Sequence, residues 1–160
     1  MACEILVGIG AVLTVWGRPH RSDMGRVLSA VREEACRYGR PVVYVTRVPL
    51  SAPTPDAKAR QDLNELLPHM MGACHSYHVI LEGHGFMAAM KRGALTSILQ
   101  PFWRKRVFYV HAVAQEILDH VDGDERANTS ELLRLATRRG LLRCASPLTL
   151  PPPRPGVLAS

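Results

Sequence analysis

Hydrophobic and polar residues follow two alternating patterns along the chain. Short runs rich in β-branched residues have the composition of buried strands, and longer segments carry apolar residues at helical spacing. Strands are predicted over residues 5–9, 12–16, 42–46, 77–81 and 107–110. Helices are predicted over residues 24–35, 59–74, 86–99, 113–121 and 130–142.

Strands that alternate with helices predict an α/β sandwich, because parallel neighbouring strands need a crossover connection between them. We expect a four- to five-stranded, mostly parallel or mixed sheet with helices packed mainly on one side. This α/β domain is predicted over residues 1–125, with an additional C-terminal helix within residues 126–144. Residues 145–160 are rich in proline and are expected to form an extended tail.

The 160 residues carry a formal net charge of +6. A basic surplus favours acidic partners such as nucleic acid or an anionic membrane. The basic residues are spread along the chain, so the charge alone does not assign either partner. A site of that kind would use the arginines of the last predicted helix and the residue just beyond it, which are Arg134, Arg138, Arg139 and Arg143.

The four cysteines lie far apart and form no CxxC pair, which argues against a zinc-ribbon site. They are interpreted as free, mostly buried thiols in a reducing compartment. The first residues have no basic leader pattern, and no apolar run approaches the ~18 residues that span a bilayer. The sequence therefore predicts a cytoplasmic protein.

Motifs that carry catalytic chemistry are absent: the sequence has no GxxxxGK[ST], HExxH, GxSxG or EF-hand loop. The Gly8-Ile9-Gly10 run matches the start of a dinucleotide fingerprint, but its third glycine is missing and no helix is predicted to open there. Two strand glycines at a bend are the better interpretation. We predict no catalytic residue, no metal site and no cofactor.

The turn Glu82-Gly83-His84-Gly85 joins a predicted buried strand to a helix and exposes backbone N–H groups. Such a turn can receive an anion or the carboxylate of a partner, or it can be a tight connection without a ligand. His111 is predicted to follow a neighbouring strand, so Glu82, His84 and His111 could together form a small-ligand or enzyme site at the carboxyl edge of the sheet. His78 is expected to be a hydrogen-bonded core histidine.

Residues 86–103 are apolar on nearly all sides and contain few charges. A helix of this kind is either central to a core or part of an interface. Phe102 and Trp103 near its end are candidate anchors for a protein contact, and a homodimer through this segment is one hypothesis.

Three segments, PVVYVTRVPLSAPTPDAKARQDLNELLPHMM, HVILEGHGFMAAMKRGALTSIL and KRVFYVHAVAQEIL, resemble STAS-like domains of the SpoIIAA-like, anti-sigma-factor antagonist type. The resemblance covers about residues 41–121. It implies a sandwich that docks a regulatory protein partner, sometimes under phosphorylation control. Ser51 and Thr54 are the hydroxyls in the loop after the third predicted strand, but the phosphoacceptor turn of that family is absent.

The sequence thus predicts a non-catalytic, partner-binding or regulatory protein that acts through protein contacts. Formation of a homo-oligomer is one hypothesis for these contacts. The alternative is a small-ligand binder or enzyme whose site lies at the carboxyl ends of the strands. A hollow bordered by Glu82, His84 and His111 would favour the alternative.

Overall fold

The computed structural model describes residues 3–17, 21–49, 51–52, 56–82, 88–93 and 108–143. Five strands form one sheet, namely β1 (Glu4–Gly8), β2 (Ala11–Val15), β3 (Val42–Arg47), β4 (Cys74–Ile80) and β5 (Phe108–His111). The strands lie in chain order, with β1 antiparallel to β2 and the other neighbours parallel. The predicted α/β class and mixed sheet are confirmed.

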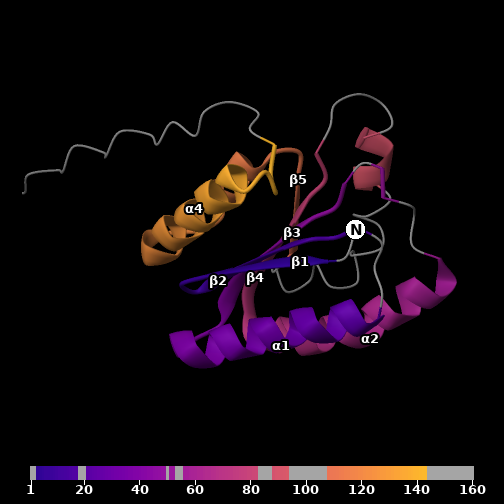
Figure 1. Cartoon of the computed structure of the whole chain (residues 1–160), viewed down its shortest axis with the longest axis horizontal. Coiled ribbons are helices and arrows are strands. Elements are labelled where there is room, and N and C mark those ends of the chain that lie inside the picture. Colours follow the sequence, from indigo (N-terminus) through magenta and orange to yellow (C-terminus); the bar gives the residue numbers. More distant parts are fainter. Residues whose placement is uncertain are drawn as a thin grey trace, which may run out of the picture.

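Two crossover helices cover one face of the sheet (Figure 1). Helix α1 (Arg21–Tyr38) connects β2 to β3, and α2 (Ala57–Ala73) connects β3 to β4. Each parallel strand is added on the same side of the previous one, so right-handed crossovers place both helices on the same face.

The chain after β5 builds the opposite face. It forms η2 (Ala114–Asp119), a 3₁₀-helix in place of the α-helix predicted over residues 113–121, and then α4 (Gly123–Arg138). Helix α4 packs over β1 and β2, so helices lie on both faces of the sheet (Figure 1). None of the helices within the described ranges combines the length and apolar character that a transmembrane helix requires.

Alternation along the strands divides the buried residues between two cores, because successive side chains point to opposite faces. The core beneath α1 and α2 includes Val12, Val27, Val31, Tyr44 and Tyr77. The core beneath α4 and η2 includes Leu13, Val45, Ile80, Ile117 and Leu133. Both faces of the central strands are therefore buried, as their almost continuous apolar runs indicate.

Gly10 lies in the two-residue turn that joins β1 to β2, and this turn is docked on α1. Its φ is +62°, and its N–H donates to the buried carboxylate of Glu34 at 2.8 Å. A Cβ at this position would lie 2.5 Å from the ring of Tyr38. The Gly8-Ile9-Gly10 run is thus a hairpin bend, as predicted, and no helix opens from it.

Candidate functional site

The sheet face beneath α4 changes from apolar to polar between β3 and β4. Beneath α4, the strands present apolar residues such as Leu6, Leu13 and Val15. On the same face of β4 and β5, most alternate positions instead carry polar or aromatic residues, with Ile80 as the apolar exception; they are Ser76, His78, Tyr109 and His111. Buried polar side chains require hydrogen-bond partners, so this half of the face is the place to search for a site.

A chain of close polar contacts runs through this half of the face. His78 Nε2 lies 2.9 Å from Ser76 Oγ, and His78 Nδ1 lies 2.9 Å from His111 Nε2. His111 Nδ1 lies 3.7 Å from Glu116 Oε2, and that oxygen also accepts the Ala112 N–H at 3.0 Å. The chain therefore leads from a buried strand position to a half-exposed carboxylate on η2.

The carboxylate of Glu116 sets the direction of these hydrogen bonds. With a proton on Nδ1, His111 presents an N–H to the carboxylate, and its Nε2 accepts the Nδ1–H of His78. His78 Nε2 then accepts the hydroxyl hydrogen of Ser76. In the opposite arrangement His111 would present a lone pair to a negative charge, so we assign the first set of tautomers.

Burial keeps both His78 and His111 neutral. Desolvation, together with the neighbouring His111 and His120, lowers the pKa of His78 to about 3. Desolvation also lowers the pKa of His111 to about 4, with His120 acting in the same direction and Glu116 opposing it. At neutral pH the imidazole pair offers hydrogen bonds without positive charge.

The series of polar contacts from Ser76 to Glu116 ends at a surface hollow of about 540 Å³ beside β5. Its described lining consists of Phe108, Tyr109, Val110, His111, Glu116, Asp119 and His120. The rings of Tyr109 and His120 stack with centroids 4.3 Å apart and form an aromatic wall. A concave site with aromatic walls and a few polar groups is typical of small-ligand binding.

Of the lining residues, only His111 was among the candidates predicted from the sequence. Tyr109 precedes His111 by two positions and therefore shares its face, a signal that strand alternation alone contains. Glu116, Asp119 and His120 join the site because η2 folds back over β5. That return depends on tertiary packing and has no sequence signature. The prediction that His78 is a hydrogen-bonded core histidine is confirmed.

Glu82 belongs to a separate arrangement at the end of β4. Its Oε2 lies 2.9 Å from Arg47 Nη2, and its Oε1 accepts the backbone N–H of Arg143 at 3.1 Å. His111 lies at the same carboxyl edge, where its carbonyl accepts the Leu81 N–H at 3.0 Å. The imidazole of His111, however, turns to His78 rather than to Glu82. Glu82 thus ties β3, β4 and the segment after α4 together.

The substitution Glu82→Gln is expected to lower the free energy of unfolding by about 2 kcal/mol, because it leaves a largely buried arginine without its counter-charge. Glu131→Gln is the matched control, since Glu131 forms only exposed ion pairs on α4. That change should alter stability by less than about 0.5 kcal/mol. Urea unfolding of both variants measures the difference, and equal effects would contradict a structural role for Glu82.

Most of the residues predicted to bind a partner lie outside the part of the chain that the structure describes. Thr54, Gly83, His84, Gly85, Phe102 and Trp103 are outside the described residues, as is most of the predicted dimer segment. Ser51 is exposed in a turn that the Ala52 N–H closes on the Pro49 carbonyl at 2.9 Å. The partner-binding and regulatory role therefore stays a prediction.

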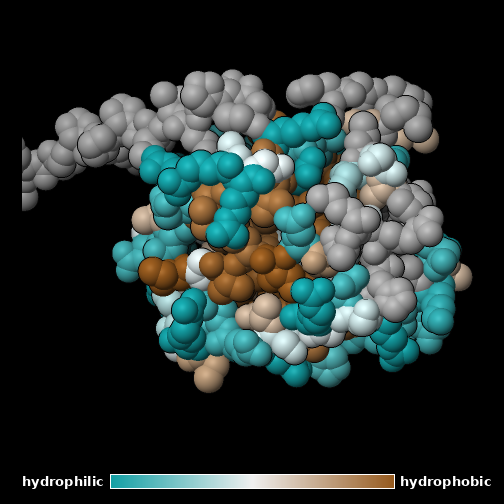
Figure 2. Space-filling view, in the orientation of Figure 1, coloured by the Kyte–Doolittle hydropathy of each residue, from teal (hydrophilic) through white to brown (hydrophobic). Residues whose placement is uncertain are grey.

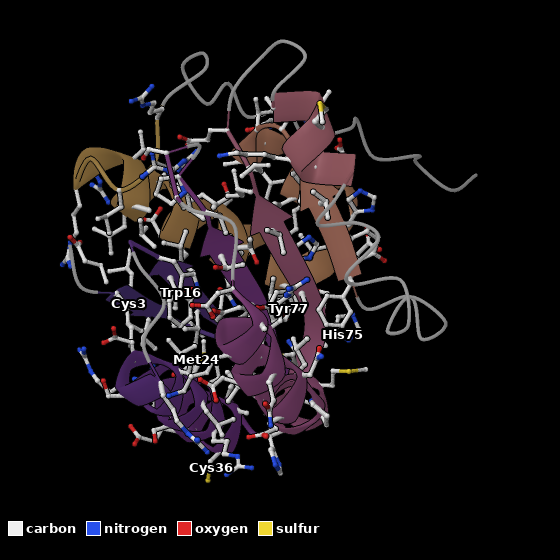
Figure 3. All side chains as sticks on the ribbon, turned by 90° about the vertical axis from the view of Figure 1, so that its right-hand side faces the viewer. Cys3, Trp16, Met24, Cys36, His75 and Tyr77 are labelled. Atoms are coloured by element: carbon white, nitrogen blue, oxygen red, sulfur yellow. The ribbon has the colours of Figure 1, made fainter. Side chains whose placement is uncertain are left out.

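Two of the three described cysteines are buried thiols. Burial raises the pKa of Cys3 to about 11 and that of Cys74 to about 12, so neither is a thiolate at neutral pH. Figure 3 shows Cys3 near Trp16, between α1 and the sheet, and Cys36 on the outer side of α1. None of the three lines the hollow beside β5.

The described ranges contain no preformed metal site, because no three of their His, Cys, Asp or Glu side chains are arranged to hold an ion. His78 and His111 come close, but their facing nitrogens are 2.9 Å apart and hydrogen-bonded to each other. The accepting nitrogen of this pair has its lone pair engaged and the donating nitrogen carries a proton, so in this arrangement neither offers a lone pair to an ion.

No protein-family model, curated protein or solved structure matches this chain. The STAS-like resemblance therefore stays a prediction, and the function is inferred from the geometry of the hollow.

Proposed function

We propose that the protein binds a small organic cation in the hollow beside β5, with Glu116 and Asp119 as its charge partners. The observation that carries the proposal is the combination of two carboxylates with an aromatic wall in one concave site. The proposal corresponds to the small-ligand alternative predicted from the sequence, moved from Glu82 to the η2 side of His111.

Charge selects the class of ligand. The lining contains two acidic side chains and no Lys or Arg among its described residues. The buried histidines add no positive charge at neutral pH, since desolvation disfavours their protonated forms. An ammonium or amidinium group would thus meet negative charge, whereas a carboxylate or phosphate ligand would be repelled.

The aromatic wall selects shape. Tyr109 stacks on His120 and on His78, so its ring is held in one orientation. A fixed aromatic face attracts a cation or a flat ring placed against it. The Ala112 N–H donates to the Glu116 carboxylate at 3.0 Å, and His111 acts as a positioning residue because its Nδ1 faces the same carboxylate oxygen at 3.7 Å.

Three probes of similar size and different charge test the proposal: benzylammonium, benzyl alcohol and benzoate. We expect benzylammonium to shift the NMR signals of Tyr109, His111 and His120 with a dissociation constant of about 1 mM, the weak affinity of a small fragment. Benzoate should leave these signals unchanged. Equal binding of benzoate, or no shift at the hollow with any probe, would refute the proposal.

Variants locate the binding. Asp119→Asn and Glu116→Gln should each weaken benzylammonium binding about tenfold, the effect of losing one charge partner. Glu131→Gln removes an exposed carboxylate on α4 and should leave the affinity unchanged. An affinity that survives both lining variants would place the cation elsewhere.

A further inference from the structure

The outer edge of β1 carries exposed apolar residues. Val7 is 42% exposed and Ile9 is 65% exposed. Figure 2 shows hydrophobic residues gathered over β1 between α4 and α1. Natural edge strands are usually blunted by Lys, Pro or a bulge, but β1 has the sequence EILVG and a continuous register with β2.

The register fixes which backbone groups of β1 point outward. Gly8 faces Ala11 across a two-residue turn, so this pair and every second pair after it exchange hydrogen bonds. The N–H and C=O groups of the intervening residues, Ile5 and Val7, therefore point away from β2. Within the described ranges no strand pairs with this edge.

The geometry points to a second copy of this chain as the occupant of the β1 edge, paired antiparallel about a two-fold axis at Leu6. Ile5 then faces Val7 of the second copy, and the outward backbone groups of both residues find partners. Two identical sheets would then join into one continuous sheet through their edge strands. Two-fold symmetry is the commonest symmetry of homodimers.

Charge complementarity favours this occupant over an unrelated strand. The exposed Glu4 marks one end of β1. The exposed Arg40 marks the other, because its guanidinium lies 4.5 Å above the Tyr38 ring that packs on the Gly10 turn. An antiparallel two-fold brings each Glu4 to the Arg40 end of the other copy and keeps like charges apart. β5 is the opposite edge of the sheet, so this interface is independent of the hollow.

Light scattering of the whole chain over a range of concentrations tests the dimer. We expect the mass to approach twice 17.7 kDa as concentration rises. Val7→Lys places a charge at the interface twice and should weaken the dimer about tenfold or more. Met90→Lys is the matched control, since Met90 is 54% exposed outside this edge. Met90 lies in the dimer segment predicted from the sequence, residues 86–103, so this variant separates the two interfaces and should dimerise like the parent.

Amide hydrogen exchange of the unaltered chain provides a second readout that does not depend on how a variant folds. The amides of Ile5 and Val7 should exchange more slowly at high than at low protein concentration, whereas the Leu6 amide is bonded within the sheet at both. A chain that stays monomeric would overturn the proposal. So would a dimer that Val7→Lys leaves intact, or one with unprotected Ile5 and Val7 amides.

Discussion

The protein is expected to lose stability steeply as the pH falls from about 6.5 to 4, because unfolding forces two buried histidines to take up protons. Burial lowers the pKa of His78 from 6.5 to about 3 and that of His111 from 6.5 to about 4. Below pH 6.5 the unfolded chain therefore binds more protons than the folded chain. The stabilisation is complete above this value and is lost as the pH falls toward the two folded-state pKa values.

The slope of this dependence sets its size. Each histidine that is protonated only in the unfolded chain contributes about 1.4 kcal/mol per pH unit. Between pH 4 and 6 both histidines act together, so the loss reaches several kcal/mol, a large part of the stability of an ordinary domain. Urea unfolding at intervals across this window measures the slope directly.

One variant and one control assign the slope to the buried pair. His78→Gln keeps a side chain that can donate and accept hydrogen bonds but removes one titrating group, so the slope should fall by about half in this window. His69→Gln changes an exposed histidine on α2 and should keep the parent slope. A parent whose stability is flat in this window, or a His78→Gln variant with the full slope, would contradict the assignment.

Most of the fold follows from local signals in the sequence. The strand predicted over residues 42–46 is β3. The strand predicted over residues 77–81 corresponds to the C-terminal part of β4 and ends one residue beyond it. Both are β-branched or aromatic runs buried on two faces, which is the strongest strand signal available. Helix α4 starts at Gly123, before the predicted start at residue 130, because its first two turns carry almost only polar residues and therefore show no apolar periodicity.

The site was predictable only in part. His111 and the carboxyl edge followed from the predicted order of strands and helices, and the role of His78 followed from its place in a buried strand. The approach of His120 to Tyr109 required η2 to turn back across β5 within a few residues. Likewise, no pattern in residues 4–8 tells an edge strand from a central one, since that depends on whether another strand pairs with β1 on the side away from β2.

A second large effect is expected at the hairpin turn, where Gly10→Ala should lower the free energy of unfolding by about 3 kcal/mol. Two costs add. An alanine at a φ of +62° is strained by about 1 kcal/mol, and its Cβ would lie 2.5 Å from the Tyr38 ring, so the ring must leave its place. Displacement of the turn would also stretch the 2.8 Å bond from the Gly10 N–H to the buried Glu34.

Gly39 separates the two costs, because it has a φ of +75° with no atom near the position of a Cβ. Gly39→Ala should therefore cost only the backbone strain, about 1 kcal/mol. Thermal or urea unfolding gives both values, and similar losses at the two glycines would show that the ring contact contributes nothing.

Removing the ring supplies the decisive comparison. Tyr38→Ala has its own cost through lost packing on the turn, but it also clears the space that the new methyl group needs. The double variant Gly10→Ala with Tyr38→Ala should therefore be more stable than the sum of the single losses predicts, by about 1 to 2 kcal/mol. Strict additivity would mean that the turn and the end of α1 do not restrain each other. We expect this coupling because Glu34 and Tyr38 lie one turn apart on the same helix and both contact Gly10. Glu34 accepts the Gly10 N–H, and the Tyr38 ring packs against the Gly10 Cα.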